Sequence, residues 1–91
     1  MIFGNDFNQP INDYLYKLVN LKTLEFDYEF NQPINNSLDK LINLESLKFG
    51  YGFNQKIGDS LNTLVNLKSL KFTNNYKFKN LLHENLIKIV S

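Results

Sequence analysis

Apolar residues of this chain recur in a pattern that repeats every 23 residues. In the middle copy, 30–52, they first follow the spacing of a helix and then alternate with polar residues as in a strand. Closely similar copies lie at 7–29 and 53–77, and partial copies lie at 1–6 and 78–91. Because a chain of 91 residues accommodates one small domain, we expect a single domain built from these repeats.

Each copy divides into three sections with different expected structures. The first, Phe30–Ile34 in the middle copy, contains Asn-Gln-Pro, and proline favours a turn or an irregular extended segment. The second, 35–44, places apolar residues at steps of four and three, which predicts a short helix of about one or two turns, partly of 3₁₀ type. The third, Leu44–Phe49, has the pattern L-x-x-L-x-F and predicts a strand of a few residues.

Short polar residues mark the expected ends of these helices. Asn36 and Ser37 are candidate N-caps in the middle copy, and similar places in the neighbouring copies are occupied by Asp13, and by Asp59 with Ser60. Asparagine tolerates the left-handed conformation that often ends a helix. We therefore expect a recurring asparagine to end each helix just before the next leucine, at Asn20, Asn43 and Asn66.

A single copy cannot bury its own apolar residues, but stacked copies can. We expect parallel strands about 4.8 Å apart, joined by right-handed crossovers. The predicted fold is an α/β repeat: a short right-handed solenoid with parallel strands on its concave face and short helical or 3₁₀ turns on its convex face. The residues expected to point inward in the middle copy are Phe30, Ile34, Leu38, Leu41, Leu44, Leu47 and Phe49.

The pattern L-x-x-L-x-F resembles the strand motif of leucine-rich repeats, and F-N-Q-P-I after it resembles the FNIP repeat, a relative of about 22 residues. The resemblance covers about 7–77. FNIP proteins occur mainly in amoeboid protists and in the giant DNA viruses that infect them. The resemblance implies a leucine-rich-repeat-like protein-interaction module in the cytoplasm, that of the host if the protein is viral. Some such proteins carry an F-box before the repeats and resemble ubiquitin-ligase substrate adaptors, but no F-box precedes the repeats in these 91 residues.

The position of the recurring asparagine differs from that in common leucine-rich repeats. There, the asparagine lies three residues after the last strand leucine, whereas here it follows the phenylalanine that opens each copy. We expect its side chain to bond to the loop backbone of the adjacent copy, because buried or crowded backbone groups need a partner. The asparagines at this position are Asn8, Asn31 and Asn54.

The composition narrows the possible functions. The net charge is +1, lysines and carboxylates are interspersed, and arginine is absent, so we expect neither nucleic acid nor anionic lipid as a partner. The absence of cysteine excludes disulfides and zinc–thiolate sites. No apolar run approaches the roughly 20 residues of a membrane span, and the first residues do not resemble a signal peptide. We therefore expect an intracellular protein that does not enter a membrane.

The titratable side chains do not form a recognisable catalytic set. His83 is the only histidine; Glu84 beside it would suit a general base, but a solvated residue explains it more simply. There is neither a glycine-rich phosphate loop nor a metal-ligand cluster. We expect the strand phenylalanines to form core rather than a platform for nucleic-acid bases. The chain is predicted not to be an enzyme and to use no cofactor or metal.

The remaining candidates are residues expected to point outward from the strands or to lie just past them, on the face that solenoids commonly use for partners. Tyr28 and Tyr51 are the best anchors, because tyrosine is frequent in interaction hot spots. The alternative, that these are ordinary solvated positions, stays open. The candidate partner-binding residues are Thr23, Glu25, Asp27, Tyr28, Ser46, Lys48, Tyr51, Ser69, Lys71 and Thr73.

Two further interpretations stay open beside a protein–protein interaction module of unidentified partner. The ends of a stack expose unpaired edges and apolar columns, which favours a structural role through end-to-end self-association. The incomplete first and last copies would also fit a truncated fragment of a longer array with no independent function.

Overall fold

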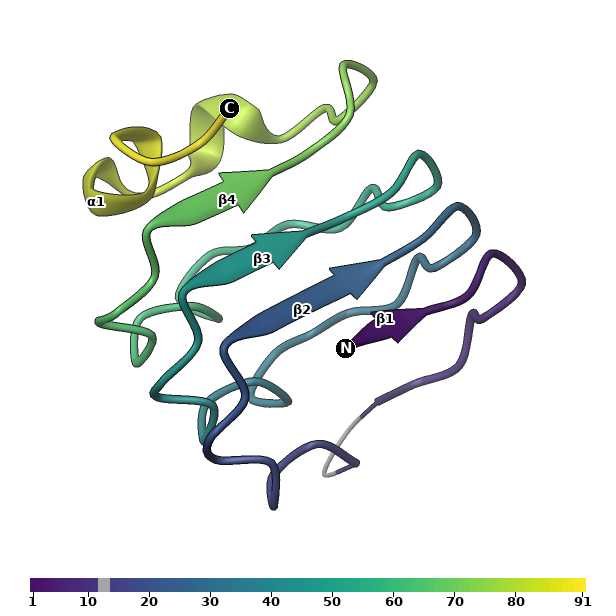
Figure 1. The fold of residues 1–91 in the computed structure, drawn as a ribbon. Coiled ribbons are helices and arrows are strands. Elements are labelled where there is room, and N and C mark those ends of the chain that lie inside the picture. The colour runs from purple at the N-terminus through teal and green to yellow at the C-terminus, as the bar shows by residue number, and fades with distance from the viewer. Residues whose placement is uncertain (12–13) are drawn as a thin grey trace.

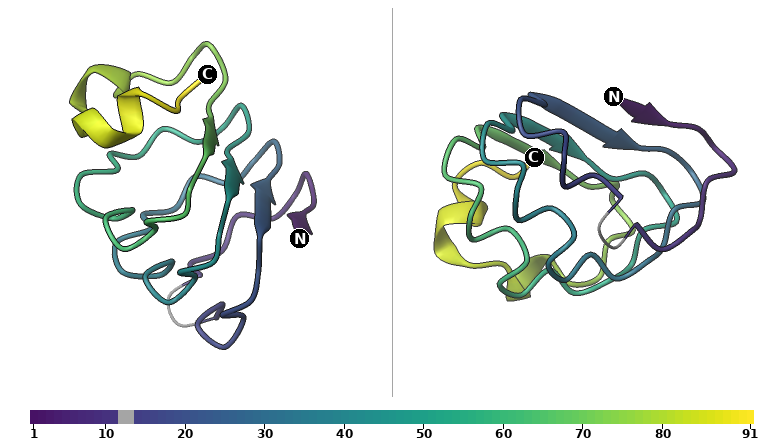
Figure 2. Two further views of the ribbon diagram at one scale, coloured as in Figure 1. Left: turned by 60° about the vertical axis from the view of Figure 1, so that its left-hand side comes forward. Right: turned by 90° about the horizontal axis from the view of Figure 1, so that it is seen from below.

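The structure, a computed structural model, describes residues 1–11 and 14–91. Its central element is a four-stranded, all-parallel sheet in which consecutive strands are neighbours (Figure 1). The chain returns from each strand to the next on one side of the sheet (Figure 2). The strands are β1 (Ile2–Phe3), β2 (Thr23–Phe26), β3 (Ser46–Lys48) and β4 (Ser69–Lys71).

Neighbouring strands pair equivalent positions of successive copies. Leu24 in β2 pairs with Leu47 in β3, which pairs with Leu70 in β4. β1 joins β2 in the same way, through Phe3 and Phe26. Each pair is 23 residues apart in the sequence, so the period of the sequence is also the register of the sheet. The prediction of parallel strands that pair copy by copy is therefore confirmed.

The section between strands forms separate turns instead of the short helix, partly of 3₁₀ type, expected over 35–44. The Ser37 N–H donates to the Ile34 carbonyl at 2.6 Å, and the Leu41 N–H donates to the Leu38 carbonyl at 3.0 Å. These bonds span three residues, as in a 3₁₀ helix, but they do not follow one another at consecutive residues. The expected 3₁₀-type bonding is present, whereas a continuous helix is not.

A left-handed residue lies at the start of this section in two copies. Asn35 has φ of 36°, and Gly58, the equivalent residue of the next copy, has φ of 53°. Asparagine and glycine adopt this conformation at low cost, and it interrupts a right-handed helix. Asn36 and Ser37 therefore cap no helix. Asp59 and Ser60 also precede no helix in the third copy, all of which the structure describes. The remaining predicted cap, Asp13, lies outside the described residues.

The prediction that Asn20, Asn43 and Asn66 end helices in the left-handed conformation is wrong, because none of them has a positive φ. Two of them instead bond to the preceding copy. Asn43 Nδ2 donates to the Val19 carbonyl at 2.9 Å, and Asn66 Nδ2 donates to the Ile42 carbonyl at 3.0 Å. The recurring asparagine thus supplies a side-chain donor rather than a backbone conformation.

The C-terminal part of the chain covers the outer edge of β4. The helices of this part are η1 (Lys79–Leu81) and α1 (Glu84–Ile87). Leu82 and Leu86 are buried against the core. After α1, Val90 forms a parallel bridge with Leu70, and the Ser91 N–H donates to the Leu70 carbonyl at 3.0 Å.

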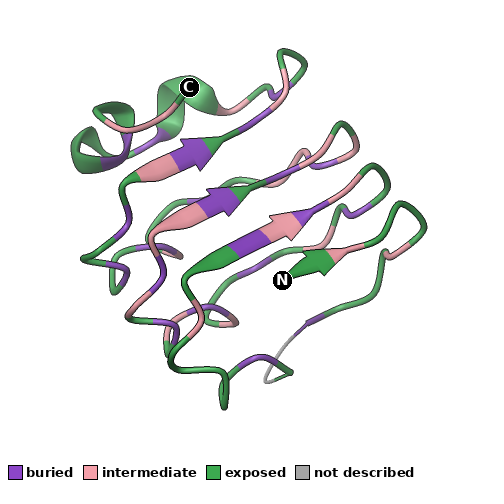
Figure 3. Ribbon diagram, viewed as in Figure 1, coloured by how far each residue is buried: buried purple, intermediate pink, exposed green. Residues whose placement is uncertain are grey.

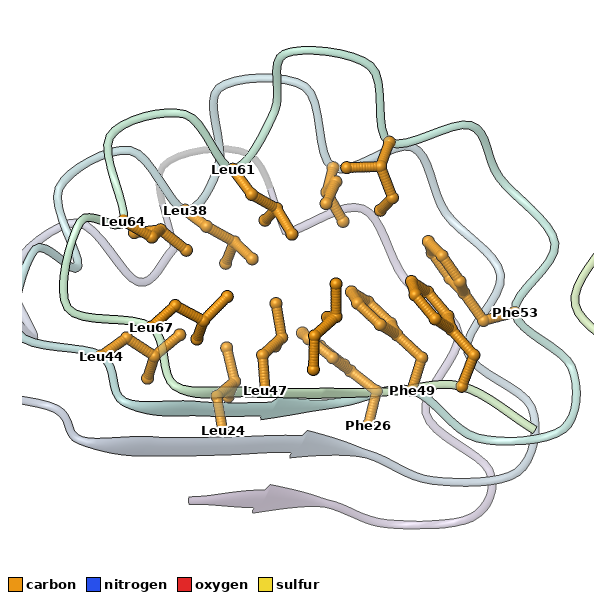
Figure 4. Close-up of a cluster of buried hydrophobic side chains, with 14 of the residues drawn as sticks. Leu24, Phe26, Leu38, Leu44, Leu47, Phe49, Phe53, Leu61, Leu64 and Leu67 are labelled. Carbon is orange, nitrogen blue, oxygen red and sulfur yellow. The ribbon is translucent and has the colours of Figure 1, made fainter. Parts of the chain in front are cut away.

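The core lies between the sheet and the returning turns. Buried positions alternate with outward positions along the strands (Figure 3). Leu47 from the sheet and Leu61 from the turns point toward each other across the core (Figure 4). Every residue expected to point inward in the middle copy has at most 1% of its surface exposed: Phe30, Ile34, Leu38, Leu41, Leu44, Leu47 and Phe49.

Aromatic rings form two adjacent columns through this core. Successive rings within a column are stacked with centroids 5.1–6.0 Å apart. The columns also contact each other, since the Phe49 and Phe53 rings are stacked at 3.9 Å. The strand phenylalanines are therefore core, as predicted. The first column contains Phe3, Phe26, Phe49 and Phe72, and the second contains Phe7, Phe30, Phe53 and Tyr76.

Tyr76, rather than Phe78, takes the fourth place in the second column. Its ring is stacked on Phe53 at 5.9 Å, whereas Phe78 meets Tyr76 edge-on. The Tyr76 hydroxyl donates to the Gln55 carbonyl at 2.8 Å. Burial raises the pKa of Tyr76 to about 12. The sequence pattern predicts that the fourth copy begins at Phe78. The stacking shows that its opening aromatic is instead Tyr76, two residues earlier.

Amide side chains join the copies along the loops, as predicted. The Asn31 N–H donates to Asn8 Oδ1 at 2.8 Å, and the Asn54 N–H donates to Asn31 Oδ1 at 2.9 Å. Gln32 and Gln55 each add a second donor, with Nε2 3.0 Å from the same oxygen. The Asn-Gln pair therefore accounts for the recurring sequence after each opening phenylalanine.

Candidate partner-binding face

The outward side of the sheet carries two rows of equivalent side chains. They arise because side chains alternate along a strand, so the leucines of β2, β3 and β4 point inward and their neighbours point outward. We call Thr23, Ser46 and Ser69 the hydroxyl row. We call Ile2, Glu25, Lys48 and Lys71 the charged row.

Both rows border one open depression that crosses the sheet. Met1 and Ile2 contribute apolar lining at the β1 edge, and Lys71 contributes an ammonium group at the β4 edge. The structure thus brings six of the predicted partner-binding residues together on one surface: Thr23, Glu25, Ser46, Lys48, Ser69 and Lys71.

The ion pair on this face, between Lys48 and Glu25, is weak and exposed. Lys48 Nζ lies 3.8 Å from Glu25 Oε2, and both side chains are at least one third exposed. Solvent screens such a pair, so it leaves most of the charge of Lys48 available to a partner. Lys71 forms no ion pair within residues 1–11 and 14–91. The β4 side of the depression is therefore positively charged.

The two predicted tyrosine anchors lie on a separate surface. Tyr28 and Tyr51 are about half exposed, and their rings are stacked 5.2 Å apart at an angle of 11°. They line a second depression, formed by the loops after the strands, together with Asn8, Asn31 and other loop residues. The tyrosines therefore form a pair, but they do not line the depression on the strands.

Asp27 and Thr73, the two remaining candidates, are half buried and do not line the strand depression. Thr73 forms a hydrogen bond with Asn75, whose Nδ2 donates to the Tyr51 carbonyl at 2.7 Å. A Cβ atom at Gly50 would lie 2.3 Å from the Asp27 carbonyl oxygen, so adjacent loops approach closely here. These positions hold the loops together.

The single histidine bonds to a residue that the sequence did not indicate. His83 Nε2 lies 2.8 Å from Asp59 Oδ1, and both side chains are largely exposed. The contact joins the residue before α1 to the turns of the third copy. Within the described part of the chain, no three or more His, Cys, Asp and Glu side chains are grouped for a metal ion.

A third depression, which sequence reasoning missed, lies between the turns of the second and third copies. The two left-handed residues, Asn35 and Gly58, are part of its lining, as are Asp39 and Thr63. The Thr63 hydroxyl donates to the Asp39 carbonyl at 2.9 Å across this boundary. The available signal was the alignment of Asn35 with Gly58, since both residue types favour a positive φ.

Comparisons with protein-family models, with curated proteins and with solved structures find no match for this chain. Among the described residues, no helix has the length and apolar character that crossing a membrane requires.

Proposed function

We propose that this chain is a short FNIP-type solenoid, similar to leucine-rich repeats, that binds a protein partner through the outward side of its sheet. The observation that carries the proposal is the constant register of 23 residues between strands, which aligns outward side chains into rows. A partner would meet a surface held in place from below by the stacked rings and leucines.

The chemistry of the rows favours binding over catalysis. Serine, threonine and lysine side chains offer donors and acceptors to a partner, and the parallel strands hold them at regular intervals of about 4.8 Å. The proposal does not rest on the fold alone, since one fold supports many functions. It rests on the hydroxyl row and the charged row bordering the same depression.

We further propose that the crossovers are right-handed and that the strands form the concave side. A parallel strand–crossover–strand connection is right-handed in almost all known cases. An experimental structure would check both features directly.

The binding proposal can be tested by adding neutral bulk to the strand face. Ser46→Tyr with Ser69→Tyr would fill the depression, and tyrosine is well tolerated on strands. The matched control is Ile42→Tyr with Val65→Tyr, at exposed turn positions. Affinity capture with quantitative mass spectrometry should lose specific partners only with the strand-face variant. Equal partner sets for the two variants would contradict the proposal, once circular dichroism shows that both are folded.

A further inference from the structure

Charge is divided unevenly between the two halves of the chain, although lysines and carboxylates are interspersed overall. Residues 1–45 contain three lysines and seven carboxylates, whereas residues 46–91 contain seven lysines and two carboxylates. The formal net charges of the halves are therefore −4 and +5. Because strands are ordered as they occur in the sequence, this asymmetry runs across the sheet from β1 to β4.

The charged row shows the same gradient within the depression. It begins with Ile2, which is 68% exposed, and continues through Glu25 to Lys48 and Lys71. Glu25 offsets only part of the Lys48 charge at 3.8 Å. The depression thus has one end lined by the apolar side chains of Met1 and Ile2, beside the Met1 amino group that donates to the Thr23 carbonyl at 3.0 Å, and a second end lined by lysines, with the hydroxyl row beside both.

The spacing of the strands sets the spacing of a matching ligand. Parallel strands lie about 4.8 Å apart, so Lys48 and Lys71 lie about 10 Å and about 14 Å from Ile2 across the sheet. An extended peptide advances about 3.3 Å per residue. Its third and fourth residues after an apolar side chain at Ile2 would therefore lie level with the two lysines. Because successive side chains of a regular strand point to opposite sides, the segment must twist as a polyproline II chain does, with about three residues per turn, so that the third residue faces the sheet and the fourth lies beside it.

We propose that the depression binds an extended acidic segment of a partner protein, crossing the strands. An apolar residue of the segment packs against Met1 and Ile2, and carboxylates three and four residues away pair with Lys48 and Lys71. The hydroxyl row bonds to the backbone of the segment. This inference rests on the proposed binding function of the same face, and it adds the chemistry of the partner.

The first experiment measures the preference for acidic ligands. The probe is a fluorescein-labelled peptide, Gly-Ser-Leu-Ser-Ser-Glu-Glu-Ser-Gly, and its control replaces both glutamates by lysine. Fluorescence anisotropy should show binding of the acidic peptide alone, and the affinity should fall as salt rises from 50 to 300 mM, because salt screens exposed charges. Equal binding of both peptides, or binding of neither, overturns the proposal.

The second experiment locates the interaction. Lys48→Glu with Lys71→Glu should weaken binding of the acidic peptide ~10-fold or more, since each reversal removes an attraction and adds a repulsion. The matched control, Lys17→Glu with Lys40→Glu, changes the net charge equally at exposed lysines outside the depression. It should change the affinity less than twofold. Equal losses in both variants would overturn the proposal, because they would report net charge and not a site.

The same variants separate this inference from the proposed function. Suppose that Ser46→Tyr with Ser69→Tyr abolishes capture of a protein partner, whereas Lys48→Glu with Lys71→Glu leaves capture intact. The face then binds protein, but the proposal that the bound segment is acidic is wrong. If neither variant affects capture, both proposals are wrong. If both variants abolish capture and the Lys17→Glu, Lys40→Glu control does not, both proposals are supported.

Discussion

Chemically equivalent residues are buried in the middle of the stack and partly exposed at its ends. Phe26 and Phe49 are fully buried, whereas Phe3, at the start of the same column, is half buried and Phe72 is 9% exposed. Phe49 has a stacked neighbour in the column on each side, at 5.6 and 5.4 Å. Within the described residues Phe3 has only Phe26 as a column neighbour, at 5.1 Å.

This difference shows that burial in a repeat protein depends on the adjacent copies more than on the residue itself. The strand phenylalanines have the same local pattern in each full copy. Their free-energy contributions should nevertheless differ, because each copy supplies part of the core of its neighbours. Matched substitutions at equivalent positions measure that dependence directly.

The largest expected effect is at the centre of the first aromatic column. Phe49→Ala should lower the free energy of unfolding by about 3–5 kcal/mol, because it removes a fully buried ring and leaves a cavity. Phe3→Ala should cost roughly 1–2 kcal/mol, since about half of that burial is lost. Urea denaturation followed by circular dichroism measures both. Equal losses at the two positions would mean that the neighbouring copies do not determine the contribution.

A smaller difference in stability is expected along the amide ladder, the series of asparagine and glutamine hydrogen bonds that joins the loops of successive copies. Asn31→Ala removes the acceptor of two donors, the Asn54 N–H at 2.9 Å and Gln55 Nε2 at 3.0 Å. We expect a loss of about 1–2 kcal/mol. Asn54→Ala removes only a 3.4 Å bond from the Lys77 N–H, so its loss should be about half as large.

Urea denaturation of these two variants checks this order. The control is Asn62→Ala on an exposed turn, where the side chain makes one 3.4 Å bond, to Asp59 of its own copy, and none, among the described residues, to another copy. The opposite order, with Asn54→Ala the more destabilising, would show that the ladder does not weaken toward the C-terminal end of the stack. A loss at Asn62 as large as that at Asn31 would attribute the effect to asparagine in general rather than to the ladder.

The sequence was sufficient to predict the sheet and the core, because both follow from residue spacing. The 23-residue repeat aligned Leu24 with Leu47 and Phe26 with Phe49. The alternation of apolar and polar residues at these positions indicated which side of the strands is buried. The same reasoning predicted that Asn31 bonds to the neighbouring copy. Periodicity is informative here because the contacts repeat with it.

The turns could not be predicted in the same way, because steps of three and four residues fit a helix and a series of turns equally well. The series of separate three-residue hydrogen bonds, such as Ser37 to Ile34 and Leu41 to Leu38, distinguishes them, and the pattern of apolar residues does not contain it. The tyrosine pair was placed on the strand face because Tyr28 follows β2 closely. The loop turns it onto a second surface, and only the path of the backbone could reveal that.

The smallest expected effect is at the C-terminal end of the second column, where tyrosine replaces phenylalanine. Tyr76→Phe keeps the stacked ring and removes the hydrogen bond to the Gln55 carbonyl. At pH 8 we expect a loss of about 0.5–1.5 kcal/mol in the free energy of unfolding. Urea denaturation at several pH values measures how this loss changes as the hydroxyl ionises.

Burial raises the pKa of Tyr76 from 10.0 to about 12 in the folded chain. Between these values the unfolded chain has released the proton while the folded chain retains it, so the stability of the unmodified protein falls as pH rises. Phenylalanine has no such proton, and all other titrating groups are shared by the two proteins. The stability advantage of Tyr76 over the variant should therefore be complete well below pH 10 and shrink above it. Because the two pKa units between 10.0 and about 12 correspond to about 2.7 kcal/mol, more than the advantage at pH 8, this advantage should reverse as pH approaches 12. A gap that stays constant over this range would mean that the hydroxyl ionises equally easily in the folded and unfolded chains, and so is not held in the buried column.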